Sequence, residues 1–268
     1  MIVGLLGPEG TFSEKAANKW DSTAEPRYFE DVSDVVRAVI DDDVEYGIIP
    51  IENSLEGSVG MTLDALLKYE VKIVGEVVVP IRHCLLAKGK ISEIRTILSH
   101  PQALAQCRHS IKNSFGEIEI VETMSTARAA KRASESKEMA AIASETSAAK
   151  YGLNILLRDL QDRKENYTRF IVLGKTAPEP TSKDKTSVVV YLRKDRPGAL
   201  YEILGEFASR NINLTKIESR PTKKALGDYL FYIDLEGHIM DEKVQEALRM
   251  VEKKAGMLRV LGSYPKAE

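Results

Sequence analysis

The sequence predicts an α/β protein of two domains, and three observations support this prediction. From residue 1 to about 174, short β-branched runs alternate with helical stretches, which is typical of a mostly parallel sheet packed against helices. Residues 177–185, APEPTSKDK, combine two prolines and mixed charge without apolar periodicity, so we predict a linker there. Residues 186–265 then read as strand, helix, strand, strand, helix, strand, which is the order of a ferredoxin-like domain.

The elements of the first domain, residues 1–176, follow from where its apolar runs start and stop. Strands are predicted at residues 2–7, 28–30, 46–52, 72–87, 96–100, 117–122, 139–144 and 168–174. Helices are predicted at residues 11–20, 32–40, 62–69, 101–111, 125–135 and 145–152. Residues 72–87 are longer than an ordinary strand, so the chain is expected to enter a second lobe of about residues 78–158. The strand at 168–174 returns, and two crossings predict a two-lobed clamp with a cleft between the lobes.

The second domain is simpler. Its strands are predicted at residues 186–193, 214–221, 229–237 and 258–264, and its helices at residues 199–211 and 241–255. In the first of these helices Ile203, Leu204 and Phe207 recur at helical spacing, so this face is expected to pack against the sheet.

Composition excludes several classes of protein. The 268 residues carry a formal net charge of -2, which argues against a general binder of nucleic acid or anionic membranes. No apolar run approaches the roughly 20 residues that span a bilayer, and the opening MIVGLLGPEG reaches glycine and proline too soon for a signal peptide, so we expect a cytoplasmic protein. Cys84 and Cys107 lack any metal-ligand spacing, and we expect buried thiols and no metal.

The N-terminal glycines raise the question of a nicotinamide cofactor. They follow the first strand and open a helix, at Gly4, Gly7 and Gly10. Leu5 and Leu6 stand where a dinucleotide-binding turn needs close glycines, and Pro8 removes a backbone donor from that turn. We therefore expect no cofactor.

Polar side chains recur where the predicted strands end and the helices begin. They are Thr11, Asn53, Ser54, Ser99, Gln102, Ser125 and Thr126. Ligands of α/β sheets bind at the carboxyl ends of strands, and helix starts attract anions, so these residues are candidates for holding a small anionic ligand. Thr11, Ser99 and Ser125 can equally be plain helix caps, the first supported by Glu14. Glu52 is expected to be a structural partner, and His100 has no nucleophile or acid spaced to form a triad.

The stretch NYTRFIVLG, residues 166–174, places polar residues at the mouth of an apolar strand. Alternate side chains of a strand share a face, so Thr168 and Phe170 would point one way and Arg169 the other. A hydroxyl beside an apolar wall then faces the cleft. Arg169 reaches the cleft if the strand bends or starts late, and otherwise pairs with an acid such as Asp159 or Glu165.

Taken in order, these segments resemble the motif series of the prephenate dehydratases. GPEGTFSEKAA, IPIENSLEGSVG, SHPQALAQC and ENYTRFIVLG carry the likeness, and PGALYEIL and KIESRP resemble the effector motifs of an ACT regulatory domain. Tyr201 stands where the first effector motif often has valine, which bears on effector affinity. The resemblance covers nearly the whole chain and implies a catalytic domain like a periplasmic binding protein. It also implies decarboxylating dehydration of prephenate to phenylpyruvate without a cofactor, by a monofunctional enzyme.

The resemblance also implies roles for individual residues. Thr168 would donate a hydrogen bond to the leaving ring hydroxyl, Phe170 would supply a dry wall, and Arg169 belongs to the same catalytic motif. L-phenylalanine would bind as an allosteric effector between the ACT domains of two subunits, in a homodimer or a homotetramer. The implied effector residues are Gly198, Ala199, Leu200, Glu218, Ser219, Arg220 and Pro221. Glu218 and Arg220 can instead form an ion pair along the strand edge.

Two alternative functions remain open. The first is an arogenate dehydratase. Its substrate, arogenate, differs from prephenate only at one side-chain carbon, which carries an ammonium group in place of the oxygen, and no residue here decides between the two. A two-lobed small-molecule sensor with an amino-acid-binding domain would share the clamp and perform no chemistry.

Overall fold

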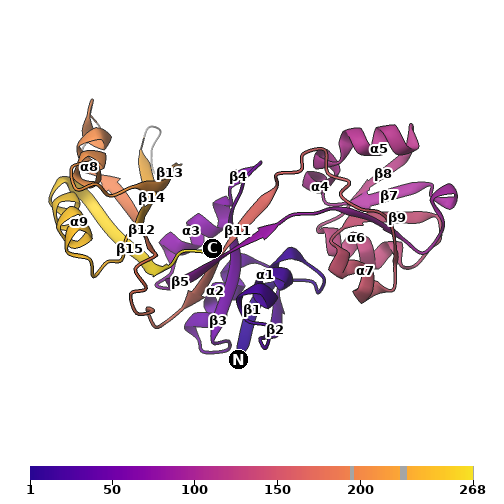
Figure 1. The fold of residues 1–268 in the computed structure, drawn as a ribbon, viewed down its shortest axis with the longest axis horizontal. Helices are drawn as coiled ribbons and strands as arrows, with labels where there is room; N and C mark the ends of the chain where they lie inside the picture. Colours follow the sequence, from indigo (N-terminus) through magenta and orange to yellow (C-terminus); the bar gives the residue numbers. More distant parts are fainter. Residues whose placement is uncertain (194–195, 224–227, 268) are drawn as a thin grey trace. The chain divides into compact units, whose positions relative to one another are not determined.

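The computed structural model describes residues 1–193, 196–223 and 228–267, and these residues form three β-sheets with helices around them (Figure 1). The α/β class is therefore confirmed. The contacts divide the chain into two compact units. One unit comprises residues 1–35, 48–59 and 77–170, and the other comprises residues 36–47, 60–76 and 171–268.

The first sheet has the strand order β2-β1-β3-β11-β5, with the short β4 paired to β3. Its strands are β1 (Ile2–Leu6), β2 (Glu25–Phe29), β3 (Tyr46–Asn53), β4 (Gly57–Ser58), β5 (Lys72–Pro80) and β11 (Tyr167–Gly174). The helices that connect them are α1 (Phe12–Trp20), α2 (Val32–Ile40) and α3 (Gly60–Lys68). The interiors of β3 and β11 are apolar and buried, which fits strands that lie inside the sheet.

The second sheet has the order β10-β6-β9-β7-β8. Its strands are β6 (Cys84–Ala87), β7 (Thr96–Ser99), β8 (Glu119–Glu122), β9 (Met139–Ala143) and β10 (Asn154–Leu157). With it come the 3-10 turn η1 (Ile91–Glu93) and the helices α4 (Pro101–Gln106), α5 (Arg108–Phe115), α6 (Thr126–Ala133) and α7 (Glu145–Tyr151). β5 ends in the first sheet and β6 begins in the second after three residues, so the predicted crossing within 72–87 is confirmed.

Both sheets are mixed, whereas the sequence predicted a mostly parallel sheet. β7 runs parallel to β8 and to β9, but β6 runs antiparallel to β9 and to β10, and β3 runs antiparallel to β4. β6 enters its sheet directly from the crossing and not through a strand-helix-strand unit, so the connection that makes neighbouring strands parallel does not apply to it.

The helix predicted at residues 101–111 is two helices. Cys107 separates α4 from α5, with φ -113° and ψ 11°, outside the helical region. The carboxylate of Asp162 accepts hydrogen bonds from the backbone N–H groups of His109 and Ser110, both at 3.0 Å. A negative charge on these first N–H groups stabilises a new helix start, which explains the break.

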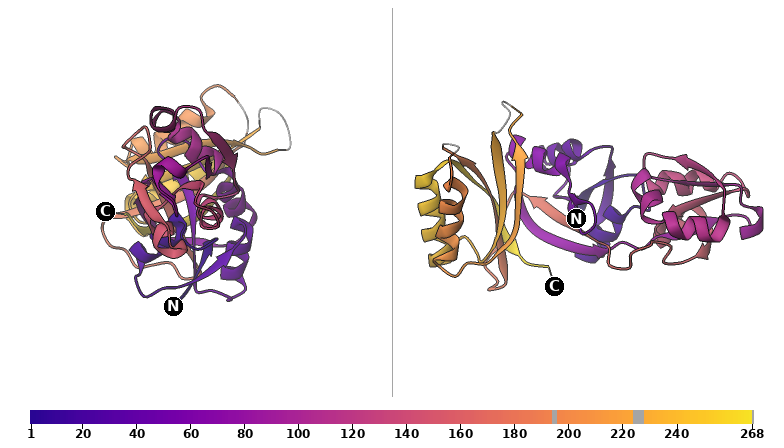
Figure 2. Two further views of the ribbon diagram at one scale, coloured as in Figure 1. Left: turned by 90° about the vertical axis from the view of Figure 1, so that its right-hand side faces the viewer. Right: turned by 90° about the horizontal axis from the view of Figure 1, so that it is seen from above.

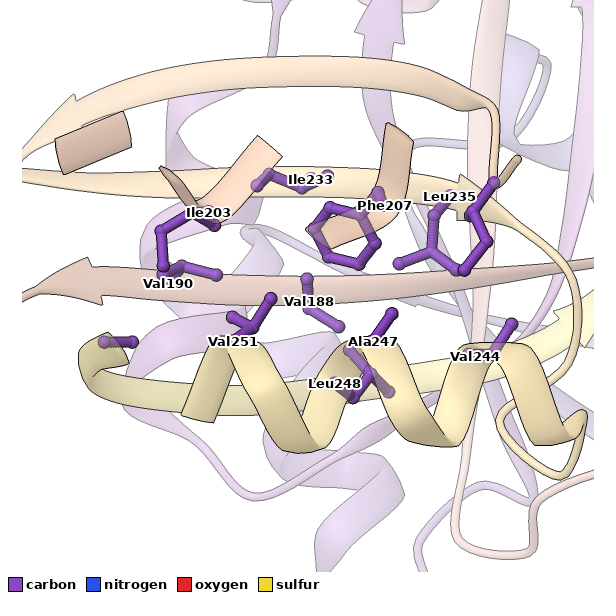
Figure 3. Packing of buried hydrophobic residues seen from close by; sticks show 12 residues of the cluster. Val188, Val190, Ile203, Phe207, Ile233, Leu235, Val244, Ala247, Leu248 and Val251 are labelled. Atoms are coloured by element: carbon purple, nitrogen blue, oxygen red, sulfur yellow. The ribbon is translucent and has the colours of Figure 1, made fainter. Parts of the chain in front are cut away.

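The C-terminal sheet is antiparallel and has the order β13-β14-β12-β15, as expected for a ferredoxin-like domain. Its elements are β12 (Asp184–Leu192), α8 (Ala199–Ala208), β13 (Leu214–Pro221), β14 (Tyr229–Glu236), α9 (Glu242–Lys254) and β15 (Ala255–Pro265). Both helices cover one face of the sheet (Figure 2). Figure 3 shows the core between them, where Phe207 and Ile203 of α8 and Val251 of α9 lie against the valines of β12. The predicted packing face of the first helix is confirmed.

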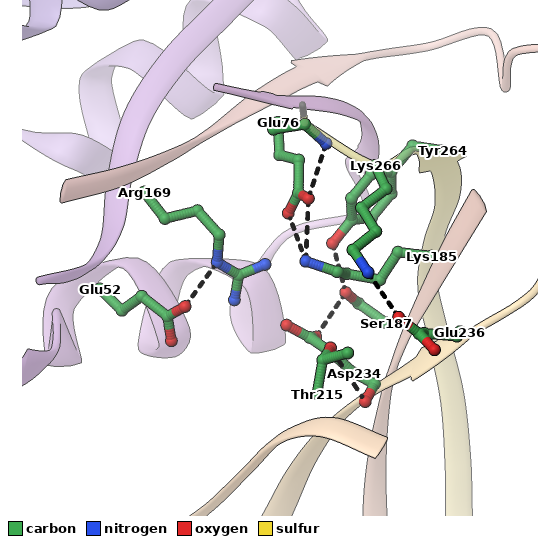
Figure 4. Close-up of polar contacts among 11 residues, drawn as sticks. Glu52, Glu76, Arg169, Lys185, Ser187, Thr215, Asp234, Glu236, Tyr264 and Lys266 are labelled. Atoms are coloured by element: carbon green, nitrogen blue, oxygen red, sulfur yellow. Dashed lines mark hydrogen bonds and ion pairs between the residues drawn. The ribbon is translucent and has the colours of Figure 1, made fainter. Parts of the chain in front are cut away.

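A buried ion pair joins β12 to β5 within the second unit. Lys185 Nζ lies 2.8 Å from both carboxylate oxygens of Glu76, and the two side chains are 8% and 2% exposed. Figure 4 shows this pair, together with the hydroxyl of Ser187 between Asp234 and Tyr264. Removing either charge would leave the other buried without its ionic partner, so we expect the loss of one member to be strongly destabilising.

No helix in the described ranges is long and apolar enough to cross a membrane.

Candidate active site

A cavity of about 220 Å³ lies in the first compact unit, at the ends of β3, β11, α4 and α6. Its lining residues are Phe12, Asn53, Ile81, His83, His100, Gln102, Ala103, Gln106, Met124, Ser125, Thr126 and Thr168. Within the described part of the chain, this lining contains neither a carboxylate nor a lysine or arginine. A charged ligand would therefore meet hydroxyls, amides and imidazoles together with apolar side chains.

Thr168 is the second residue of β11, and its side chain is 9% exposed at the edge of the cavity. Asn53 Nδ2 donates a hydrogen bond to Thr168 Oγ1 at 2.9 Å. A hydroxyl that accepts from one neighbour keeps its own hydrogen for another acceptor. The Thr168 O–H group can therefore donate to a molecule in the cavity, as its position on the strand predicted.

The amide of Asn53 is held in one orientation. Its Oδ1 accepts hydrogen bonds from the backbone N–H groups of Leu55 at 2.9 Å and Glu56 at 3.2 Å. Backbone N–H groups only donate, so the oxygen must face them and the NH₂ group must face Thr168. This local turn, which the residues after β3 make with the Asn53 side chain, fixes the donor that acts on Thr168.

The start of α6 brings two further predicted residues to the cavity. Ser125 is the N-cap, and its Oγ accepts a hydrogen bond from the N–H of Arg128 at 3.1 Å. Ser125 and Thr126 both line the cavity. The first N–H groups of a helix carry partial positive charge, so this end of the cavity suits an anionic group.

The start of α4 differs from the prediction. Gln102 lines the cavity as expected, but the N-cap is His100 and not Ser99, with His100 Nδ1 accepting from the N–H of Gln102 at 3.3 Å. Ser99 is fully buried and still belongs to β7, where its hydroxyl donates to the carbonyl of Ile142 at 2.6 Å. A side chain committed to the neighbouring strand cannot cap the helix or reach a ligand.

Thr11 and Ser54 are also absent from the cavity lining in the described part of the chain. Thr11 occupies the N-cap position of α1, yet its hydroxyl donates to the carbonyl of Leu6 at 3.2 Å and makes no cap bond. Glu14 accepts the N–H of Gly10 at 2.7 Å and the hydroxyl of Tyr28 at 2.8 Å, so the expected cap of Thr11 supported by Glu14 is not formed. Ser54 Oγ accepts the N–H of Tyr167 at 3.0 Å and so fastens the loop after β3 to the start of β11.

Arg169 and Phe170 are not among the residues that line the cavity. Arg169 Nε donates to Glu52 Oε1 at 2.7 Å, so Arg169 pairs with an acid as expected, although this acid is Glu52 and neither of the two examples named, and Glu52 is a structural partner as predicted (Figure 4). Asp159 pairs with Arg82 instead. Phe170 is buried outside the described lining. The apolar wall that was assigned to it comes from Phe12, Ile81, Ala103 and Met124.

Two cavity residues had no chemistry assigned from the sequence, His83 and Gln106. His83 is buried directly before β6, and its Nε2 lies 3.1 Å from Gln106 Oε1. Burial lowers the pKa of His83, against the opposing effect of the Gln106 hydrogen bond, so the ring is neutral. The phenyl ring of Phe12 packs edge-on against it. Gln106 lies in the motif SHPQALAQC, and this motif is the sequence feature from which Gln106 could have been identified as a candidate.

The predicted effector residues lie on two elements of the C-terminal domain. Gly198 is the N-cap of α8 with φ 83°, and Ala199 lines a cavity of about 200 Å³ with Arg196, Glu202 and others. The N–H of Ala199 already donates to the carbonyl of Arg196 at 3.1 Å. Leu200 follows Ala199 in α8.

β13 carries the remaining effector candidates, Glu218, Ser219, Arg220 and Pro221. The ion pair proposed between Glu218 and Arg220 is wrong. Arg220 Nη2 lies 3.1 Å from Asp64 Oδ1 and also donates to the carbonyl of Gly60 at 3.4 Å, both in the same compact unit. Arg220 therefore pairs with a carboxylate of α3, that of Asp64, and not with one on its own strand.

The described residues contain no group of three or more His, Cys, Asp and Glu side chains that could hold a metal ion. Cys84 and Cys107 are buried and unbonded thiols, as predicted.

Comparisons with known proteins cover the whole chain. Residues 3–178 match the family described as prephenate dehydratase, and residues 186–252 match the ACT domain. A prephenate dehydratase of Methanocaldococcus jannaschii is 46% identical over 268 residues, with 96% of each chain covered. A bifunctional chorismate mutase/prephenate dehydratase of Aquifex aeolicus is 45% identical over 267 residues, covering 99% of this chain and 74% of that protein. The crystal structure of a prephenate dehydratase from Arthrobacter aurescens in complex with L-Phe superposes with a TM-score of 0.92 at 39% identity, covering 99% of this chain and 90% of the other.

Proposed function

The chain belongs to the prephenate dehydratase family, the hydro-lyases of phenylalanine biosynthesis, and we propose that prephenate reacts in the cavity beside Thr168. The observation that carries this proposal is the hydrogen bond from Asn53 Nδ2 to Thr168 Oγ1, which leaves the threonine hydrogen for the substrate. The reaction consumes the prephenate dianion and one proton and yields the phenylpyruvate anion, carbon dioxide and water.

Thr168 assists the departure of the ring hydroxyl. As the ring C–O bond breaks, negative charge develops on the leaving oxygen, and a donor already aimed at it stabilises that charge. A free threonine hydroxyl is a very weak acid, so we assign it stabilisation of the developing charge and not full proton transfer on its own. The electron pair of the C–COO⁻ bond enters the ring as carbon dioxide leaves, and the ring becomes aromatic.

The neutral lining favours the same step. A cation bonded to the ring carboxylate would stabilise the substrate more than the transition state, because the carboxylate loses its charge as carbon dioxide departs. The described lining offers no such cation. The pyruvyl carboxylate keeps its charge throughout, and the start of α6 with Ser125 and Thr126 is the part of the cavity suited to hold it.

The test is turnover of the purified protein on prephenate and on arogenate, followed as formation of phenylpyruvate and phenylalanine. Turnover of prephenate supports the proposal, and turnover of arogenate alone would replace it with an arogenate dehydratase. Binding of either compound without product would assign the chain to the sensors.

The C-terminal domain is proposed to bind L-phenylalanine as a feedback inhibitor. The relative from Arthrobacter aurescens was solved with L-Phe, and in this chain Gly198 caps α8, whose first residue, Ala199, lines a cavity and is followed by Leu200. A coupling of about 1 to 3 kcal/mol between the two sites suffices for regulation. Calorimetric titration of the wild type and of Leu200→Asp tests it, and equal phenylalanine binding by both proteins would reject this pocket.

We further propose a division at residues 177–185 between a catalytic domain, 1–176, and a regulatory domain, 186–265, with the second lobe at about 78–158. The family matches at 3–178 and 186–252 support these bounds. Tyr201, Ile217 and Tyr229 expose apolar surface on the regulatory domain, which supports a homodimer formed there, and such dimers can pair into a tetramer. Light scattering measures the assembly. Two unbonded buried thiols agree with a cytoplasmic location.

A further inference from the structure

A continuous chain of side-chain hydrogen bonds leads from Thr168 to His83. Asn53 Nδ2 lies 2.9 Å from Thr168 Oγ1, 2.8 Å from Asn166 Oδ1 and 3.1 Å from the carbonyl oxygen of Tyr167, so its two hydrogens are shared among three acceptors, of which the two side chains are nearer. Asn166 Nδ2 donates to Gln106 Oε1 at 2.9 Å, and the same oxygen lies 3.1 Å from His83 Nε2. These five residues come from four segments of the sequence, because Asn166 and Thr168 belong to the same stretch, and Asn53, Asn166 and His83 are all at least nine-tenths buried.

The polarity of this chain is fixed at the Asn53 end. Because backbone N–H groups hold Asn53 Oδ1, the Asn53 nitrogen must face Asn166, and the atom of Asn166 that meets it must be the oxygen. The Asn166 nitrogen then faces Gln106, which must present its own oxygen. Each amide is thus oriented by the one before it.

The polarity is fixed independently at the other end. Gln106 Nε2 lies 3.4 Å from Glu56 Oε1, and a carboxylate only accepts, so this contact also turns the Gln106 oxygen toward Asn166 and His83. An oxygen facing His83 Nε2 requires a proton on Nε2. His83 Nδ1 is buried and has no partner among the described residues, so it carries a bare lone pair and the ring is the neutral Nε2–H tautomer.

We propose that Asn166 and His83 are positioning residues of the dehydration, which act through Gln106 and Asn53 to keep the Thr168 hydroxyl hydrogen pointing into the cavity. The inference rests on the proposed function, since Thr168 is the donor that it orients. The reason is geometric. The neighbour of Thr168 in the chain presents a donor and not an acceptor, and the Thr168 hydroxyl donates no hydrogen bond among the described residues, so its hydrogen is left for the substrate.

Asn166→Asp tests the direction of the chain without changing its shape. An ionised carboxylate at position 166 has no hydrogen for Gln106 Oε1 and repels it, so the chain is interrupted. We expect kcat at about pH 8 to fall roughly 10- to 100-fold, as for a displaced catalytic group. Protonation restores an O–H donor, so kcat relative to wild type should recover as the pH falls toward 5.5, helped by burial, which raises the pKa of such a carboxyl.

The pH profile has to be separated from other titrating groups. The titratable and charged side chains on the surrounding segments include Glu52, Glu56, Arg82, His83, His100, Asp162, Lys164, Glu165 and Arg169. All of them are present in the wild type, so the ratio of variant to wild type cancels their contribution. Asn154→Asp is the matched control, because Asn154 is exposed on β10 and its ratio should stay level across the range. Asn166→Ala has no titrating group and should show no recovery.

His83 is tested with two substitutions. The amide nitrogen of glutamine can replace Nε2 as a donor, so His83→Gln should keep kcat within about threefold to tenfold of wild type. His83→Ala should have a kcat roughly tenfold lower than that of His83→Gln. In both variants KM should change less than kcat. A merely structural role would lower stability in both variants without this difference in kcat.

A nuclear magnetic resonance measurement on the wild type needs no catalysis. The chain contains four histidines, so ¹⁵N-labelled His83 can be assigned by comparison with His83→Gln. We expect the shift pattern of a protonated Nε2 and a bare Nδ1 at neutral pH. An Nδ1–H tautomer or an imidazolium, or an Asn166→Asp variant that follows the wild-type pH profile within a factor of about three, would overturn the inference. If the wild-type protein does not turn over prephenate, the proposed function is rejected instead, whatever tautomer is found.

Discussion

Arg169 Nε donates to Glu52 Oε1 at 2.7 Å, with the arginine side chain 7% exposed and the glutamate side chain 32% exposed. Arg169 follows Thr168 in β11, so the alternation of the strand turns the threonine to the cavity and the arginine to the carboxylate on β3. The two neighbours therefore face different surroundings, Thr168 the cavity and Arg169 the Glu52 carboxylate.

A double-mutant cycle measures this pair. Arg169→Met and Glu52→Gln should each lower the free energy of unfolding by roughly 1 to 3 kcal/mol, less than for a fully buried pair because Glu52 is partly solvated. The double variant should lose less than the sum of the single losses, with a coupling of about 1 kcal/mol in urea denaturation. Strict additivity would mean that the pair contributes no net coupling.

Replacement of Thr168 tests its part in the reaction. Thr168→Ala should lower kcat by roughly 10² to 10⁴ fold with a smaller effect on KM, because it removes a donor that acts in the transition state. Thr168→Ser should retain much of the rate, and Thr23→Ala, at an exposed threonine, should leave it unchanged. An alanine variant with near-wild-type kcat in steady-state assays would remove Thr168 from the mechanism.

Ser99→Ala separates structure from substrate binding. The Ser99 hydroxyl is buried and donates to the carbonyl of Ile142, so its loss should cost about 1 to 2 kcal/mol of stability by thermal or chemical denaturation. We expect kcat and KM on prephenate to change little. A large rise in KM at full stability would show that Ser99 contacts the substrate after all.

The carboxyl group of Asp64 should make the free energy of unfolding depend on pH. Burial raises its pKa, but the hydrogen bonds and charges of Lys223 and Arg220 outweigh burial and hold the pKa below the usual 3.8. A depressed carboxyl pKa contributes stability above the unfolded-state value, and this contribution is lost as the pH falls through the folded-state value. Asp64→Asn should therefore be less stable than wild type near neutral pH, and the gap should close below about pH 3.8 in urea titrations. A gap that is constant from pH 7 to about 3 would contradict this.

Much of the fold could be predicted because apolar spacing is a local signal. The core of α8 and the long run that leaves the first sheet at β5 followed from it. The break at Cys107 could not, since its cause is the carboxylate of Asp162, which the sequence places far away. The direction of β6 depends on where the chain re-enters a sheet, which spacing does not encode.

The candidate site divides in the same way. Asn53, Gln102, Ser125, Thr126 and Thr168 were found because they sit at strand ends and helix starts, and all five line the cavity. Ser99 carries the same local signal and is turned to β9 by a tertiary hydrogen bond. His83 was missed because one histidine before an apolar strand looks like any core histidine, and its hydrogen-bond partner comes from a distant helix.

The ion pair of Lys185 and Glu76 has a consequence for domain exchange. A chimera that takes the C-terminal residues of a relative from a junction before position 185, and residues 1–176 from this chain, replaces Lys185 and keeps Glu76. Such a hybrid would leave a buried charge without its partner unless positions 76 and 185 come from the same parent. The junction therefore belongs before Lys185 only when Glu76 is transferred as well.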